Sequence, residues 1–431
     1  MKRLAIVLLG LLLALLAVTA GVAWLNVRGE VGSEPTSTTG AVSPAGAELI
    51  TRGAYLARAG NCMGCHTAAG GPAYAGGRGV PTPFGTVFAP NLTPDGATGL
   101  GAWSSADFWR ALHHGRSRDG RLLYPAFPYP NYTRVTRADA DAIHAYLRSL
   151  APVARANTPH TLRFPFDQQA ALAVWRALYF RPAAHVDDPA RAAAWNRGAY
   201  LVEGLGHCNA CHSSRNALGA SAGALDLAGG LIPVQNWYAP SLRSPHEAGV
   251  ADWPLAQITA LLKDGMAAPH GSGVAVSGPM SEVVLGSTQH LDAADLNAMA
   301  TYLQALPQTD AAAPAPGAVD STANAAGAKL YGQHCAQCHG EQGEGAPGAY
   351  PALAGNRAVT MAETANLVHI VLEGGFAPST AGNPRPYGMP PFAPVLNTDE
   401  VAQLLSFVRN SWGNRAPAVS AVEVNRGREA R

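Results

Sequence analysis

The sequence predicts an all-α protein of three similar domains in tandem, which follow an N-terminal membrane segment. Its 431 residues correspond to about three domains at roughly 150 residues each. An uncharged apolar run from Leu4 to Val27 opens the chain. One five-residue motif then occurs three times, and each copy lies between two stretches with the apolar periodicity of helices.

The apolar run after Lys2 and Arg3 decides the compartment. At ~1.5 Å per residue, Leu4 to Val27 is long enough to cross a hydrocarbon layer of ~30 Å. It exceeds an ordinary signal-peptide core, although Val18-Thr19-Ala20 offers a small-residue cleavage site. Residues 1–28 are therefore a membrane anchor or a cleaved signal peptide. With Lys2 and Arg3 held inside, both alternatives place the rest on the periplasmic side of the inner membrane.

Composition excludes two classes of protein. Charged residues make up 14% of the chain and hydrophobic residues 48%, which excludes a highly charged disordered chain. The 30 Lys and Arg residues balance 29 Asp and Glu residues. Because a net charge of +1 gives no overall positive field to gather phosphates, we expect no nucleic-acid partner.

All six cysteines belong to one motif, Cys-x-x-Cys-His. The copies are Cys62-Met63-Gly64-Cys65-His66, Cys208-Asn209-Ala210-Cys211-His212 and Cys335-Ala336-Gln337-Cys338-His339. Six cysteines in an exported chain could form disulfides, and single copies could be redox dithiols or halves of zinc sites. The histidine after each second cysteine instead favours covalent haem c, which both cysteines hold through thioethers while the histidine ligates iron. We therefore expect three covalently bound haem c groups with His66, His212 and His339 as iron ligands.

Similar helices flank each copy of the motif. Arg52-Gly53-Ala54-Tyr55-Leu56, Arg197-Gly198-Ala199-Tyr200-Leu201 and Gly327-Ala328-Lys329-Leu330-Tyr331 precede the three copies. Each unit also closes on a predicted helix with an aromatic residue near its end: Ala138 to Leu150 with Tyr146, Ala293 to Leu306 with Tyr302, and Asp399 to Trp412 with Phe407. The pattern indicates an N-terminal and a C-terminal helix that cross beside each haem.

Two methionines are candidates for the sixth iron ligand. Gly278-Pro279-Met280 and Tyr387-Gly388-Met389-Pro390 lie far enough downstream of their motifs to reach the distal side of a haem, where a methionine sulfur raises the potential. We predict Met280 and Met389 as ligands. We expect Met266, Met299 and Met361 to be packing residues.

The first repeat of the motif departs from this pattern. Trp103 to Gly115 aligns with Trp253 to Gly265, but Phe127 stands where the ligand methionine is expected. Met63 lies between the two cysteines and cannot reach the distal side. Either the first iron is five-coordinate or another side chain binds it, and the candidates are His113, His114 and His144.

These residues give the chain a resemblance to the membrane-associated tri-haem cytochrome c subunits of bacterial periplasmic dehydrogenases. The resemblance runs from about Ile50 to Asn414. Its carriers are Pro83-Phe84-Gly85-Thr86, Asn91-Leu92-Thr93-Pro94-Asp95, Thr98-Gly99-Leu100-Gly101-Ala102-Trp103-Ser104, Gly278-Pro279-Met280, Ser287-Thr288-Gln289-His290-Leu291 and Ser411-Trp412-Gly413-Asn414. It implies a large catalytic subunit as partner, of the PQQ, flavin or molybdenum type. Phe127 and the string Ser287 to Leu291 resemble the cytochromes that serve molybdenum hydroxylases.

The expected organisation follows from the motifs and the composition between them. It comprises a signal peptide or anchor at 1–28, a tether at 29–47, a first cytochrome c domain at 48–155, a connector at 156–190, a second domain at 191–307, a linker at 308–322, a third domain at 323–414 and a C-terminal tail at 415–431. The apolar stretch from Phe164 to Trp195 either packs in the core or docks on the catalytic subunit or the membrane.

The predicted function is electron transfer, without catalysis by this chain. Neither a dinucleotide fingerprint nor a nucleophile with a base stands out. We expect electrons to pass from the catalytic subunit to ubiquinone or a terminal oxidase. The alternatives are a peroxidase-like haem enzyme with an open first haem, and a free soluble carrier released after signal cleavage.

Overall fold

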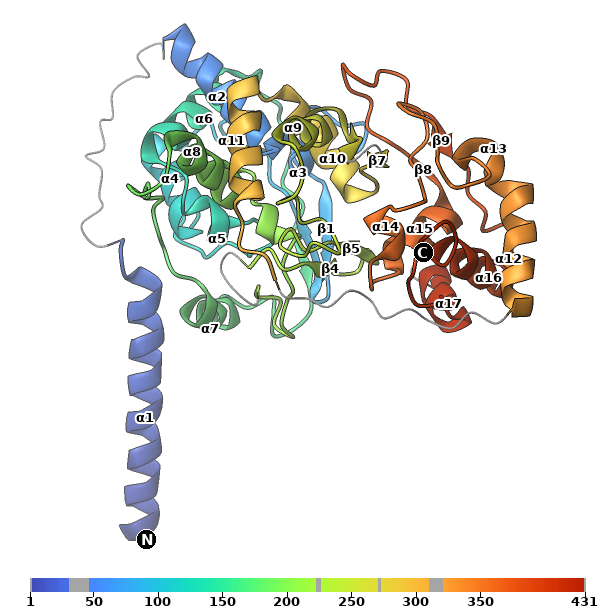
Figure 1. The fold of residues 1–431 in the computed structure, drawn as a ribbon. Coiled ribbons are helices and arrows are strands. Elements are labelled where there is room, and N and C mark those ends of the chain that lie inside the picture. Colours follow the sequence, from blue (N-terminus) through green and yellow to red (C-terminus); the bar gives the residue numbers. More distant parts are fainter. Residues whose placement is uncertain (1, 31–45, 222–225, 270–272, 310–320, 430–431) are drawn as a thin grey trace. The chain divides into compact units, whose positions relative to one another are not determined.

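Figure 1 shows the fold of the chain, which contacts between residues group into two units. The computed structural model describes residues 2–30, 46–221, 226–269, 273–309 and 321–429. Unit 1 is formed by Met1–Ala57 with Cys65–Val186, and unit 2 by Arg58–Gly64 with Asp187–Arg431. Most of the expected tether and most of the expected linker lie outside the described residues. The division into three domains stays a prediction.

Helix α1 (Lys2–Val27) is one uninterrupted helix. Its most apolar 18-residue window has a mean hydropathy of 2.7 and is not buried inside the structure. By length and composition it can cross a membrane, a property that membrane anchors share with signal sequences.

In unit 1 a glycine lets two helices approach to backbone contact. Helix α2 (Ala47–Ala59) carries Gly53 and crosses α6 (Arg137–Ser149). A Cβ atom on Gly53 would lie 1.9 Å from the carbonyl oxygen of Ala142 and 2.8 Å from Cβ of Tyr146. No residue other than glycine fits at this distance.

The same crossing occurs twice in unit 2. Gly198 of α8 (Ala193–Ala199) faces α11 (Ala293–Gln304), where its Cβ would lie 2.0 Å from the Ala298 carbonyl oxygen and 2.7 Å from Tyr302 Cβ. Gly327 of α12 (Ser321–His334) faces α16 (Thr398–Arg409), with 2.4 Å to the Gln403 oxygen and 2.6 Å to Phe407 Cβ. The predicted closing helices are confirmed, and their aromatic residues lie at the crossings.

Helix α4 shows how sequence signals set the ends of the helices. In α4 (Ser105–His114), Ser104 and Asp107 form a capping box, and Gly115 ends the helix in the left-handed conformation with φ 56°. The aligned segment forms α9 (Leu255–Asp264), which Gly265 ends with φ 74°. The remaining helical segments are α3 (Cys62–Cys65), α5 (Tyr129–Tyr132), α7 (Gln169–Tyr179), η1 (Tyr200–Leu205), η2 (Cys208–Ala210), α10 (Pro279–Gly286), η4 (Thr288–His290), α13 (Ala336–His339), α14 (Arg357–Thr360), α15 (Ala365–Glu373) and α17 (Ala421–Glu429).

Short antiparallel strands accompany the helices. In unit 1, β1 (Gly79–Thr82), β2 (Gly85–Phe88) and β3 (Thr161–Leu162) form a sheet in the order β1-β2-β3, with Gly79 opposite Phe88 and Gly85 opposite Leu162. The two-stranded pairs of unit 2 are β4 (Gly230–Ile232) with β5 (Trp237–Ala239), β6 (Met266–Ala267) with β7 (Val274–Ala275), and β8 (Gly375–Phe376) with β9 (Gly388–Met389). The fold is helix-rich, and the expectation of an all-α protein did not include these strands.

A buried arginine stabilises the core around α16 and α17. Arg409 is fully buried, and its Nη1 donates to the carbonyl oxygens of Val359 at 2.6 Å and Met361 at 3.0 Å. Its Nε donates to the Pro417 oxygen at 2.8 Å. Helix α17 packs on α15 and α16 with Val424 buried, so part of the expected C-terminal tail belongs to this core.

Replacing Arg409 with Met should destabilise the protein by about 3 kcal/mol or more, because three buried carbonyl oxygens lose their donor at roughly 1–3 kcal/mol each. Urea unfolding followed by circular dichroism measures this loss. The exposed Arg426 on α17 offers a matched control, since Arg426→Met should change stability by less than about 0.5 kcal/mol. Equal stability of the two variants would contradict the role given to Arg409.

Candidate functional site

Each Cys-x-x-Cys-His motif forms a tight helical turn. In the first two copies the residue before the first cysteine is left-handed, with φ 47° at Asn61 and φ 40° at His207, so the chain reverses sharply before α3 and η2. In the third copy, α12 ends at His334 and the motif turns immediately afterwards. All six cysteines are free of disulfide bonds, as haem attachment requires.

Each motif histidine makes the same hydrogen bond with a proline carbonyl. The Nδ1–O distances are 2.8 Å for His66 and Pro90, 2.7 Å for His212 and Pro240, and 3.0 Å for His339 and Pro351. Because a carbonyl only accepts, Nδ1 carries the proton and Nε2 keeps its lone pair. A hydrogen bond of this kind fixes the ring of a histidine that ligates a metal through its other nitrogen.

The electrostatics of the motifs suit a neutral ligand. Burial lowers the pKa of His66, His212 and His339 and outweighs the opposing effect of the proline carbonyls. The imidazoles are therefore neutral near pH 7, which is the form that binds iron. The residues present fit haem c on the proximal side.

The thiols argue against a redox dithiol. Burial raises the pKa of Cys208 to about 12, and burial with the neighbouring Cys338 raises that of Cys335 to about 11. Reactive redox thiols have lowered pKa values instead. The described residues also contain no group of three His, Cys, Asp or Glu side chains placed to hold a metal ion.

The sequence analysis missed the three prolines. Their signal is a repeated Pro-x-Leu, as Pro90-Asn91-Leu92, Pro240-Ser241-Leu242 and Pro351-Ala352-Leu353. The separation from the histidine differs, at 24, 28 and 12 residues. Because no common spacing links the two partners, only the fold shows that they meet.

The structure places the two predicted ligand methionines on different kinds of element. Met280 is the second residue of α10, which begins directly after Gly278. The φ of Gly278 is 53°, and its missing Cβ leaves room for the Trp237 ring. Met389 lies on β9, partly buried against the core that contains Tyr331 and Phe392. Their ligation of iron stays a prediction. Met299 and Met361 are buried, as expected of packing residues.

In the first repeat, aromatic rings surround the position of the missing methionine. The Phe127 ring packs against Tyr132 at 5.3 Å and Tyr129 at 6.4 Å between centroids. Met63 is largely exposed. Two alternatives therefore remain for the iron of this repeat. Either it has no sixth ligand, or a histidine is its sixth ligand.

The three candidate histidines all have ring partners. His144 of α6 stacks on Phe108 at 5.3 Å, and His113 of α4 stacks on Trp109 at 4.3 Å. His113 also meets the edge of His114. These contacts account for the burial of the rings, and burial lowers the pKa of each.

Residues 58–64 of the first repeat belong to unit 2. His207 Nε2 lies 3.4 Å from the Gly60 carbonyl oxygen, and Ser287 Oγ donates to the Ala59 carbonyl oxygen at 3.0 Å. The string that begins at Ser287 therefore borders the turn that leads to Cys62. The attachment turns of the first and second motifs meet here.

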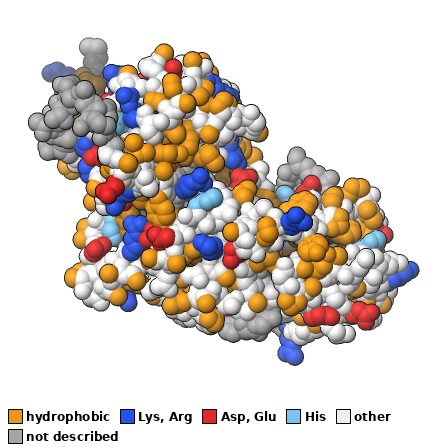
Figure 2. Space-filling view, turned by 90° about the horizontal axis from the view of Figure 1, so that it is seen from above, with side chains coloured by type: hydrophobic (Ala, Val, Ile, Leu, Met, Phe, Trp, Pro, Cys, Tyr) orange, Lys and Arg blue, Asp and Glu red, His pale blue; other side chains and the backbone are white. Residues whose placement is uncertain are grey.

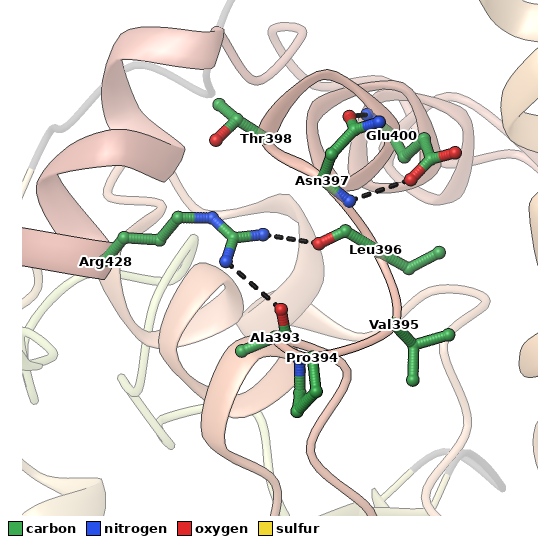
Figure 3. Close-up of a pocket in the computed structure, with 8 residues that line it drawn as sticks. All are labelled: Ala393, Pro394, Val395, Leu396, Asn397, Thr398, Glu400 and Arg428. Atoms are coloured by element: carbon green, nitrogen blue, oxygen red, sulfur yellow. Dashed lines mark hydrogen bonds between the residues drawn. The ribbon is translucent and has the colours of Figure 1, made fainter.

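A surface pocket in unit 2 is separate from the motifs. It measures about 520 Å³, and its lining includes Ala393, Leu396 and Arg428. Figure 3 shows Arg428 of α17 donating to the carbonyl oxygens of Ala393 and Leu396. These bonds dock α17 on the loop before α16, so the pocket serves the fold.

On the face drawn in Figure 2, basic and acidic side chains are interspersed.

Comparison with known proteins identifies relatives along most of the chain. The family model described as cytochrome c matches residues 50–151 and 324–412. The cytochrome c subunit of a quinone alcohol dehydrogenase from Gluconacetobacter polyoxogenes is 38% identical over 407 residues, which cover 88% of this chain and 84% of that protein.

Two further relatives belong to other dehydrogenases. The gluconate 2-dehydrogenase cytochrome c subunit of Pantoea cypripedii is 39% identical over 400 residues, 87% of this chain and 88% of that protein. A nicotinate dehydrogenase subunit from Pseudomonas putida is 40% identical over 378 residues, which are 86% of this chain and 31% of that longer protein.

Unit 1 should lose stability as the pH falls from about 6.5 toward 4. The pKa of His114 is lowered to about 4, mainly by burial and next by the charge of His113. The pKa of His144 is also lowered to about 4, mainly by burial and next by the charge of Arg148. The unfolded chain, with ordinary histidine pKa values near 6.5, binds more protons in this range, so the free energy of unfolding falls with pH. Urea titrations between about pH 7 and pH 4.5 should show a weaker pH dependence for His114→Gln. An unchanged slope would mean that His114 does not titrate in this way.

Proposed function

This chain belongs to the family of cytochrome c subunits of dehydrogenase complexes, and on that basis we propose that it carries electrons through three haem c groups. The electrons come from a large catalytic dehydrogenase subunit and leave to ubiquinone or a terminal oxidase. Membership of the family implies covalently bound haem c. Beyond this membership, we propose the number of haems, the electron acceptor and the type of catalytic partner.

The threefold recurrence of the proline contact carries the proposal. His66, His212 and His339 each donate Nδ1–H to a proline carbonyl and each follow two cysteines. Haem c, when bound, supplies an iron centre that accepts and returns one electron. The chain's own residues hold the imidazole neutral and oriented, which lets the iron change oxidation state without a change in its proximal ligand.

Contacts inside unit 2 support transfer between successive sites. The hydrogen-bond distance between His207 and Gly60 brings the first and second attachment turns together. Between the second and third repeats, the backbone N–H of Tyr238 donates to Asn366 Oδ1 and Asn366 Nδ2 donates back to the Tyr238 carbonyl, both at 2.7 Å. Arg357 Nη2 also donates to Asp252 Oδ2 at 2.6 Å. Such contacts join the second and third repeats within unit 2.

We assign α1 as a retained anchor in the inner membrane, with the repeats on the periplasmic side. Lys2 and Arg3 precede the helix and favour its N-terminus in the cytoplasm. At its other end, the side chain of Asn26 donates to the Ala173 carbonyl oxygen of α7, in the connector that follows the first repeat. The mass of the mature N-terminus tests this assignment, because cleavage after Ala20 would remove most of α1 and leave a soluble carrier.

Haem counting gives the direct test of the proposed function. The purified chain should carry three haems by intact mass and by the pyridine haemochrome assay, and Cys335→Ser with Cys338→Ser should carry two. The double variant removes both thioether positions of the third motif and leaves the other two motifs intact. A wild-type chain with the mass of its amino acids alone would end the proposal.

Replacing Met280 with Leu should lower the potential of the second haem by on the order of 0.1 V, because axial ligands tune haem potentials over a range of ~0.8 V. Leucine keeps the volume of the side chain and removes the sulfur. Met266→Leu is the matched control, since Met266 lies on β6 and is expected only to pack. A redox titration in which both variants match the wild type would refute Met280 as a ligand.

Two experiments separate the remaining alternatives. Carbon monoxide added to the reduced protein reports an open iron site, and failure to bind at the first haem would exclude the peroxidase-like alternative.

Co-purification from native membranes identifies the catalytic partner. The three possible outcomes are a molybdenum, a PQQ and a flavin enzyme, and the relatives at 38% to 40% identity do not separate them.

A further inference from the structure

Helix α7 exposes an apolar stripe. Ala170, Val174 and Leu178 recur every fourth residue on its outer face, where Val174 is 47% exposed and Leu178 57% exposed. Tyr179 extends the stripe. The charged side chain of this helix, Arg176, points inward and is buried. A helix that faces water normally carries polar residues on that side, so the stripe marks an interaction surface.

The stripe lies beside the end of the helix that can cross a membrane. Figure 1 shows α7 next to the C-terminal end of α1, and Asn26 Nδ2 donates to the Ala173 carbonyl oxygen at 2.9 Å. Arg176 Nε donates in turn to Asn26 Oδ1 at 2.9 Å. Because Asn26 lies in the last turn of α1, a helix bonded to it lies at the depth where α1 leaves the hydrocarbon layer.

The residues around this junction are typical of a membrane interface. Arg28 Nη2 donates to the Phe180 carbonyl oxygen at 3.3 Å, and Arg181 Nη1 donates to the same oxygen at 2.8 Å. Both guanidinium groups therefore lie at the C-terminal end of α7. Trp24 on α1 and Phe164 before α7 are both exposed, and aromatic side chains concentrate at this level of a bilayer.

We propose that α7 lies in the membrane–water interface and buries the stripe of Val174, Leu178 and Tyr179 among the lipids. This inference rests on the proposed retention of α1 as an anchor. The occupant is the bilayer, because the stripe continues the apolar surface of α1 and is flanked by arginines. Amphipathic helices bind membranes in this way, with the apolar face buried and the basic residues at the headgroups.

Arg176 connects the proposed membrane contact of α7 with the first repeat. Its guanidinium lies over the rings of Tyr129 at 5.2 Å and Phe180 at 4.8 Å, and Nη1 is 3.5 Å from the carbonyl oxygen of Gly115. The same side chain thus joins α1, α7 and the end of α4. With both α1 and α7 on the membrane, the first haem-binding repeat has a defined orientation toward the bilayer.

A single introduced thiol tests the proposal in the full-length chain. Because the six native cysteines are held in haem thioethers, Leu178→Cys carries the one reactive thiol. The purified, haem-loaded variant is placed in phospholipid vesicles without any dehydrogenase subunit and treated with membrane-impermeant PEG-maleimide. Val422→Cys is the matched control, since Val422 is 60% exposed and lies on α17, a helix of unit 2.

Leu178→Cys should react roughly tenfold or more slowly than Val422→Cys, because lipid covers it, and should react fully once SDS denatures the protein. Equal rates in the vesicles would overturn the proposal. Protection that disappears when the protein is diluted in lipid would overturn it in favour of a second copy. Protection seen only in native membranes would overturn it in favour of the catalytic subunit. Haem content and the N-terminal mass of the same sample report separately on the proposed function and on retention of α1.

Discussion

Backbone contact between two helices, permitted by one glycine, recurs in all three repeats. Gly53, Gly198 and Gly327 each lie against a carbonyl oxygen and the Cβ of an aromatic residue four positions later. A glycine inside a helix costs about 0.5–1 kcal/mol relative to alanine. An added Cβ would collide with backbone atoms and force the helices apart. Each crossing therefore requires glycine at this position.

Because each motif follows such a helix crossing, the proximal side has the same arrangement in all three sites. The chain reverses before Cys62 and Cys208 at left-handed residues, and a loop returns so that its proline carbonyl meets the motif histidine. The distal side is not uniform. Met280 starts a helix, Met389 lies on a strand, and the first repeat has Phe127 among aromatic rings. The repeats therefore differ at the positions of their predicted distal ligands, while the proximal contact is the same in all three.

A second set of contacts links the first repeat to α1. The buried guanidinium of Arg176 has Asn26 on one side and two aromatic rings on the other. Removing a charged group from water is costly unless hydrogen bonds and ring contacts replace the lost hydration. Arg176 has both kinds of contact, and its partners come from segments far apart in the chain.

Much of the chemistry was predictable because it is local in the sequence. The Cys-x-x-Cys-His spacing, the apolar run of α1 and the aromatic residues of the closing helices are short-range patterns, and α6, α11 and α16 formed close to their predicted bounds. The histidines that are candidates for the first iron illustrate the limit. His113, His114 and His144 lie in the right part of the chain, but the sequence does not tell that each ring packs on a neighbour.

The sequence by itself therefore determined the kind of cofactor and predicted the proximal ligands and the membrane segment, since residues a few positions apart specify each of them. Only the tertiary structure decided which glycines allow the crossings, which prolines orient the histidines, and that Arg176 joins α7 to the end of α1. Those partners lie from 12 to 150 positions apart, at separations that follow no common rule. They meet because loops of different length return to the same place, and packing rather than local pattern sets that return.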